Sequence, residues 1–113
     1  MKSKYTGPPE KFALYEKLIA GISAVELKGA ANPYTSINGH MTSRLDPSGK
    51  LALRLPPDER EKFLSKYDAK LFESYGIVQK EYIEVPDALL RKTAELKRYF
   101  EISVKYVQTL KPK

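Results

Sequence analysis

The chain has one histidine, His40, in the segment YTSINGHMTSRL, where it lies between Ser36 and Ser43. A serine within hydrogen-bond reach of a histidine forms the nucleophile and base of many hydrolases. The central Asn-Gly pair, however, predicts a two-residue hairpin turn, because both residues accept positive φ. Side chains alternate between the faces of a strand, so this turn places both serines on the face opposite His40. The segment therefore predicts a hairpin without a catalytic pair.

The remaining reactive side chains form no catalytic or metal-binding pattern. The chain has no cysteine, which excludes disulfides and thiolate metal sites, and a single histidine excludes a histidine cluster. The carboxylate pairs Asp58/Glu59 and Glu81/Glu84 are expected at the surface, without the environment of a general acid. No phosphate-binding glycine motif or nucleophile elbow occurs. We expect a protein that is not an enzyme and has no metal or cofactor.

Three helical regions are predicted around these residues. TGPPEKFALYEKLIAGI has prolines in its first turn and an apolar face of helical spacing, formed by Phe12, Tyr15, Leu18, Ile19 and Ile22. PDEREKFLSKY begins with acidic residues and ends near Lys66, which suits the helix dipole. A last helical region runs from about 87 to 110, with a break expected near Thr93.

Four strands are predicted between the helices. The Asn-Gly turn pairs Ile37 with His40, Ser36 with Met41, Thr35 with Thr42 and Tyr34 with Ser43. LALRL forms a third strand after a loop over 46–50, which pairs Leu45 with Leu51 and Ser43 with Leu53; a loop over 46–49 would instead place the leucines beside Arg44 and Thr42. IVQKEYIEVP forms the fourth strand, with Ile83 and Val85 inward, whereas DAKLFESYG is expected to be irregular or briefly extended.

The assembled order is α-β-β-β-α-β-α over a single domain, residues 1–113, with 1–7 and 111–113 expected to be flexible. We predict a small α+β fold in which an antiparallel sheet of about four strands has its helices on one face. The leucines, Tyr34, Ser36, Met41 and Ser43 are expected on the face toward the helices.

The opposite, outer face of the predicted sheet is the first candidate site. An aromatic side chain among basic ones on an open sheet can stack a base and pair with phosphates, although a solvated polar face has the same pattern. The interaction face is expected to comprise His40, Thr42, Arg44, Arg54, Lys80 and Tyr82.

A second candidate site is the loop GAANPY with the lysine before it. Exposed loop amides beside a cation would suit a small ligand, although a tight connection from helix to sheet favours the same small residues. This loop site is expected to comprise Lys28, Asn32 and Tyr34.

The composition restricts the partners. A net charge of +6 favours acidic partners, nucleic acid included, although the basic and acidic residues are interleaved. The polar N-terminus carries no apolar signal segment and no run is long enough to cross a membrane, so we expect a cytoplasmic protein that does not bind membranes. Surplus apolar residues on the last helix (Tyr99, Phe100, Tyr106 and Val107) make a homodimer possible.

Three segments together resemble the N-terminal domain of the TfoX family, bacterial proteins named for a competence regulator. They are VELKGAANPYTSINGHM, LALRLPPDEREKF and KEYIEVPDALLRKTAELKRYFEISVKYV, and the resemblance covers about residues 10–110. The family typically has a Met-Phe-Gly turn after the lysine, where Lys28 is here followed by GAANPY. The second domain of full-length members has no counterpart, so a stand-alone domain is expected. The resemblance implies a role near transcriptional regulation.

We therefore expect a small regulatory domain that acts through contact with an unknown protein partner. The alternatives are a nucleic-acid-binding module that uses the outer sheet face and a small-ligand binder.

Overall fold

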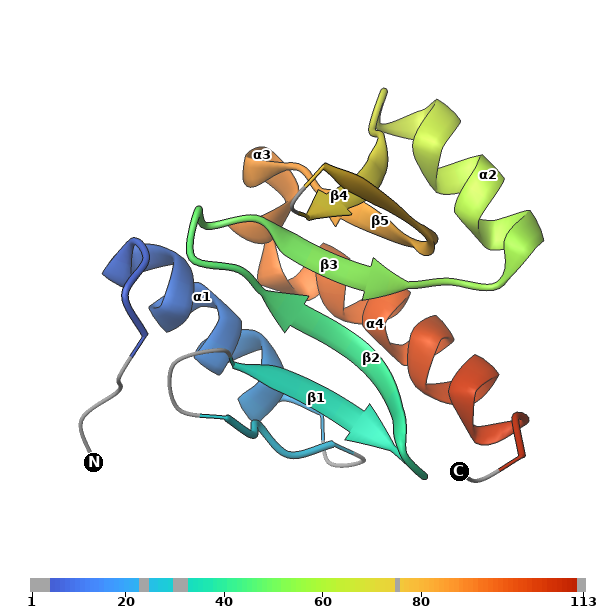
Figure 1. Cartoon of the computed structure of the whole chain (residues 1–113), viewed down its shortest axis with the longest axis horizontal. Helices are drawn as coiled ribbons and strands as arrows, with labels where there is room; N and C mark the ends of the chain where they lie inside the picture. The colour runs from blue at the N-terminus through green and yellow to red at the C-terminus, as the bar shows by residue number, and fades with distance from the viewer. Residues whose placement is uncertain (1–4, 23–24, 30–32, 75, 112–113) are drawn as a thin grey trace.

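The computed structural model describes residues 5–22, 25–29, 33–74 and 76–111. These residues form an α+β fold, as predicted, with helices beside one antiparallel sheet (Figure 1). The elements follow the chain in the order α1 (Pro9–Ala20), β1 (Tyr34–Ile37), β2 (His40–Leu45), β3 (Leu51–Arg54), α2 (Pro57–Lys66), β4 (Leu71–Ser74), β5 (Ile77–Val85), α3 (Asp87–Leu90) and α4 (Thr93–Gln108). The sheet has five strands rather than about four, because β4 forms in the segment expected to be irregular or briefly extended.

The helices begin and end where their sequences indicate. Both α1 and α2 have proline in the first turn, where its missing N–H has no partner to lose. Acidic residues occupy the first turn of α2 and Lys66 its last, which complements the helix dipole. The predicted break near Thr93 is confirmed, since α3 ends at Leu90 and α4 begins at Thr93.

The sheet has the strand order β1-β2-β3-β5-β4. The pairing of β2 with β3 is as predicted, with Ser43 opposite Leu53 and Leu45 opposite Leu51. The loop between them is held by Asp46, whose Oδ1 accepts hydrogen bonds from the Ser48 and Lys50 amides at 3.0 Å. Gly49 has φ of +90° in this loop, a conformation that other residues rarely adopt.

The hydrophobic core lies between the sheet and the helices. Figure 1 shows α1 and α4 behind β1, β2 and β3, and we call the side of the sheet that they cover the helix face. Leu45, Leu53 and Ile83 are fully buried there, so the predicted apolar register is confirmed for β3, β5 and Leu45 of β2. Met41, predicted on this same face, instead lines a groove on the opposite side of the sheet, so that part of the prediction is wrong. Phe63 of α2 also enters the core and makes an edge contact with Tyr99 of α4.

The opposite side, the outer face, is strongly curved. In a flat sheet β2 and β4 would lie about 14 Å apart, three strand spacings. Here Arg44 of β2 donates a hydrogen bond to Ser74 of β4 at 3.0 Å, and Tyr82 of β5 donates one to the Met41 carbonyl of β2 at 2.9 Å. The β4–β5 hairpin therefore folds back toward the outer face of β2. Figure 1 shows this hairpin beside β3.

The chain ends were expected to be flexible over 1–7 and 111–113. Residues 1–4 and 112–113 lie outside the described part. Tyr5 stacks on Phe12 with 5.7 Å between ring centroids, and the Lys111 carbonyl bonds to His40. In the described part of the chain, no helix combines the length and the apolar character needed to cross a membrane.

Candidate functional site

A β-bulge in the first hairpin changes which side chains face outward. The turn pairs Ile37 with His40 and Ser36 with Met41, as predicted. Beyond these pairs the register shifts, so that Thr35 lies opposite Ser43 rather than Thr42. The extra residue in β2 reverses the alternation of faces at this point. The prediction of one outward face from His40 through Thr42 to Arg44 is therefore wrong.

The hydroxyls near the bulge form a buried cluster on the helix face. Thr35, Thr42 and Ser43 are 0% exposed, as is Tyr15 of α1. Ser43 Oγ lies 2.5 Å from the Tyr15 hydroxyl and 2.6 Å from Thr35 Oγ1, and Thr42 Oγ1 donates to the Thr35 carbonyl at 3.2 Å. Burial raises the pKa of the Tyr15 hydroxyl above its ordinary value. This cluster is enclosed in the core and cannot contact a partner.

His40 is bound to the end of the last helical region. Its Nε2 lies 2.6 Å from the Lys111 carbonyl oxygen, which only accepts, so Nε2 carries the proton. The other ring nitrogen, Nδ1, is buried. One of the two serine candidates, Ser43, is hydrogen-bonded to Tyr15 and Thr35 instead. His40 thus lacks an available nitrogen with which to activate a serine.

Arg44 does lie on the outer face, where the β4–β5 hairpin holds it. Its guanidinium carbon is 5.3 Å from the centroid of the Phe72 ring, and its Nη2 donates to Ser74 Oγ. Phe72 is 1% exposed. Among the described residues no carboxylate forms an ion pair with Arg44. The arginine is therefore fixed in place while its charge stays uncompensated.

Arg54 and Tyr82 are neighbours, as predicted, but much of Arg54 is enclosed. Its guanidinium pairs with Glu81 at 2.9 Å and lies 5.9 Å from the ring centroids of both Tyr82 and Tyr106. The Arg54 side chain is 11% exposed. Burial raises the pKa of Tyr82, and the nearby Arg54 opposes that shift. Arg54 is thus enclosed by Tyr82, Tyr106 and Glu81 rather than part of an open basic surface.

The other predicted site residues do not line the recess beside Arg44. Lys80 is exposed in β5, at the irregularity where the pairing with β4 jumps from Gln79 to Ile83. Lys28 and Tyr34 are held to each other by two backbone hydrogen bonds of 2.8 and 2.9 Å, which protects the edge of β1. Asn32 lies outside the described residues. The geometry thus leaves Arg44 and Tyr82 as the predicted residues that line a recess.

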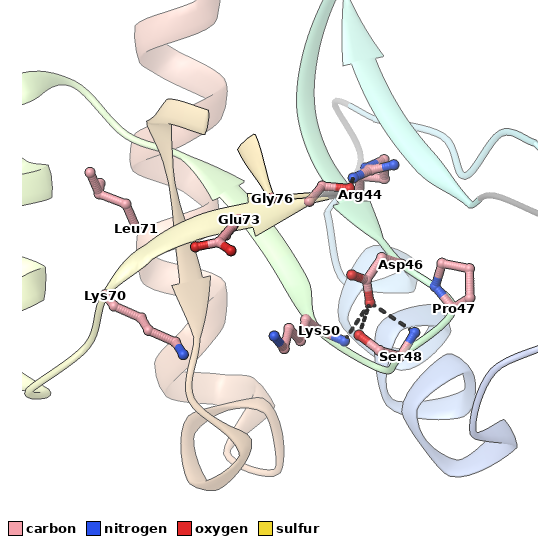
Figure 2. Close-up of a pocket in the computed structure, with 10 residues that line it drawn as sticks. Arg44, Asp46, Pro47, Ser48, Lys50, Lys70, Leu71, Glu73 and Gly76 are labelled. Atoms are coloured by element: carbon pink, nitrogen blue, oxygen red, sulfur yellow. Dashed lines mark hydrogen bonds between the residues drawn. The ribbon is translucent and has the colours of Figure 1, made fainter. Parts of the chain in front are cut away.

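The recess is a groove on the outer face with two compartments, which Arg44 and Ser74 both border. A polar compartment of about 460 Å³ lies between the 46–50 loop and β4 (Figure 2); it is lined by Arg44, Asp46, Pro47, Ser48, Lys50, Lys70, Leu71, Glu73, Ser74 and Gly76. An apolar compartment of about 350 Å³ is lined by Met41, Arg44, Phe72, Ser74, Ile77, Gln79 and Tyr82. We call the two together the outer groove.

The sequence reasoning missed the hairpin that builds this groove. Leu71–Ser74 and Ile77–Val85 are separated by two residues, one of them Gly76 with φ of +74°. Two extended runs joined by two residues that include glycine are a hairpin signal. That signal would have placed Phe72, Ser74 and Ile77 beside each other. It would not have placed them over Arg44, which depends on the curvature of the sheet.

In the described part of the chain, no group of three or more histidine or acidic side chains is arranged to hold a metal ion. Asp46, in the polar compartment, already accepts three hydrogen bonds from the loop at its Oδ1.

Comparison of the chain with protein-family models, with curated proteins and with solved structures finds no match.

Proposed function

We propose that this chain is a non-enzymatic interaction domain that contacts a protein partner through the outer groove and the tip of the β4–β5 hairpin. The observation that carries the proposal is the exposure of two large apolar side chains at that tip. Ile77 is 63% exposed and Val78 45% exposed, and Ile77 also lines the apolar compartment. Apolar side chains gathered at the rim of a groove are typical of protein contact sites. We further propose a regulatory role for this contact, because the sequence resembles the N-terminal domain of the TfoX family.

Two observations favour binding over catalysis. His40 Nε2 is committed to a backbone carbonyl, and the polar groups of the outer groove include no serine–histidine pair. The groove is also open to solvent, whereas catalytic sites usually enclose much of the substrate. Its lining, with apolar side chains beside polar ones, suits contact with a partner segment.

Nucleic-acid binding is the competing function, which the net charge of +6 favours. Of the two arginines expected to meet phosphates, Arg54 is already paired with Glu81, so only Arg44 is without an acidic partner among the described residues. The outer groove also contains carboxylates, Asp46 and Glu73, which repel a phosphate backbone. A protein partner is consequently the better fit.

The test is affinity capture from a native lysate of the source organism, with and without nuclease. The wild-type chain is compared with the double variant Ile77→Ser and Val78→Ser, whose exposed positions should tolerate the change. We expect a protein that the wild type retains after nuclease treatment and the double variant loses. Capture that disappears with nuclease, or that both chains share equally, would contradict the proposal. Light scattering of both chains shows whether that partner is a second copy.

A further inference from the structure

We infer that the outer groove recognises a peptide segment in which an acidic residue directly adjoins an apolar one. The inference rests on the proposed function and specifies its partner. It requires three features of the groove: a cation held ready for a carboxylate, an excess of positive charge around it, and an apolar compartment within one residue's reach.

Arg44 supplies the cation. A guanidinium has five N–H donors in a planar fork that matches a carboxylate, and Ser74 takes one of them. The Phe72 ring below the guanidinium restricts its motion, so little side-chain entropy remains to be lost on binding. Because the described residues provide no carboxylate for Arg44, a partner's carboxylate would complete its ion pair.

The surrounding polar compartment adds two lysines. In Figure 2, Lys50 and Lys70 extend toward one another from opposite sides of the compartment. Lys50 has a loose partner in Glu84, at 3.9 Å. Of the lining carboxylates, Asp46 accepts hydrogen bonds from the loop amides and Glu73 is exposed. The lining therefore has three cations and two carboxylates, and one of those carboxylates, Asp46, already accepts hydrogen bonds from the loop.

The apolar compartment meets the polar one at Arg44. Met41, Phe72 and Ile77 line it, together with the body of Tyr82. Because Arg44 and Ser74 border both compartments, a carboxylate on Arg44 leaves the next side chain of the segment at the apolar compartment. Consecutive Cα atoms lie about 3.8 Å apart, which fits two adjoining sites. Mixed recognition of this kind distinguishes an acidic-apolar segment from a purely acidic one and from a nucleic acid.

The test is a selection from a displayed library of random short linear peptides. The wild-type chain is the bait, and soluble Arg44→Met protein is present as competitor. Methionine keeps an apolar side chain over Phe72 and removes the charge and the donors. We expect the enriched peptides to share an Asp or Glu beside a Phe, Leu, Ile or Met.

An enriched peptide is then synthesised with a fluorescent label, and its affinity is measured by polarisation. Losing hydrogen bonds to a charged group should weaken binding about ten- to hundredfold for Arg44→Met. The analogue with Asn or Gln in place of the acid should lose as much. Arg98→Met is the matched control, because Arg98 is exposed on α4, on the other side of the sheet, and should leave the affinity unchanged.

Several outcomes would overturn the inference: no enrichment, enriched peptides without an acid, equal affinity for Arg44→Met, or displacement of the peptide by a labelled oligonucleotide. These outcomes do not by themselves contradict the proposed function, which a different result tests. If acid-free peptides bind the wild type but not the Ile77→Ser, Val78→Ser chain, the groove is a protein contact site of different specificity. Thermal melting of each variant verifies that it is folded.

Discussion

On the helix face of β2, the hydroxyls of Thr42 and Ser43 are fully buried and bonded to Thr35 and Tyr15. On the outer face of the same strand, Arg44 has no acidic partner among the described residues. One proton arrangement satisfies the inner cluster: Tyr15 donates to Ser43, Ser43 to Thr35, Thr35 to Thr42, and Thr42 to the Thr35 carbonyl. The hydroxyl cluster, in which every donor has an acceptor, stabilises the fold. The Arg44 guanidinium, which has no acidic partner among the described residues, can bind a partner's carboxylate instead.

The largest expected effect on stability is at Phe72, which is buried and also contacts Arg44 of the outer groove. Phe72→Ala removes a fully buried ring and should lower the free energy of unfolding by about 3–5 kcal/mol. It should also release Arg44, so that peptide affinity falls with stability. Urea denaturation measures the first effect and polarisation the second. Phe72→Leu, which keeps most of the volume, is the control. Wild-type stability in Phe72→Ala would mean that the hairpin is not anchored by this ring.

A smaller effect is expected within the hydroxyl cluster. Ser43→Ala leaves the buried Tyr15 hydroxyl without its acceptor and should cost about 1–3 kcal/mol. Adding Tyr15→Phe removes the orphaned hydroxyl, so the double variant should recover part of that loss. Peptide binding at the outer groove should not change in either variant. Additive losses in urea denaturation would show that Tyr15 and Ser43 are not coupled.

The smallest effect is a change in the alkaline pH dependence. Because burial raises the pKa of Tyr15 in the folded chain, the unfolded chain releases this proton first, near its ordinary value of 10.0. The contribution of this proton to the free energy of unfolding should be fully present below pH 10. Above pH 10 it should be lost, by at most about 1.4 kcal/mol per pH unit. Tyr15→Phe should make the decline shallower than in the wild type. Identical slopes for the two chains would show that Tyr15 ionises equally in both states.

Local chemistry allowed much of the fold to be predicted. The Asn-Gly turn, the prolines of α1 and α2, and the alternating leucines of β3 each act through neighbouring residues, and the β2–β3 register followed from them. The bulge was missed because it depends on contact between Thr35 and Ser43 and the Tyr15 hydroxyl from α1, far away in sequence. A shift of one residue then reversed the predicted faces.

The candidate site was less predictable than the fold. Arg44 was placed on the outer face by its position in β2, and that part is confirmed. Thr42 and Arg54 are enclosed, because the bulge turns one inward and two tyrosines and Glu81 surround the other. The groove itself comes from the β4–β5 hairpin folding back over β2. That curvature is a property of the whole sheet.

Backbone amide chemical-shift mapping of the isotopically labelled chain with a selected acidic-apolar peptide is the decisive test of peptide recognition by the outer groove. We expect shifts at Met41, Arg44, Phe72, Ser74 and Ile77, with Tyr15, Thr35 and the exposed residues of α4 unchanged. Shifts centred on α4 or on Lys28, with the outer groove unaffected, would contradict it.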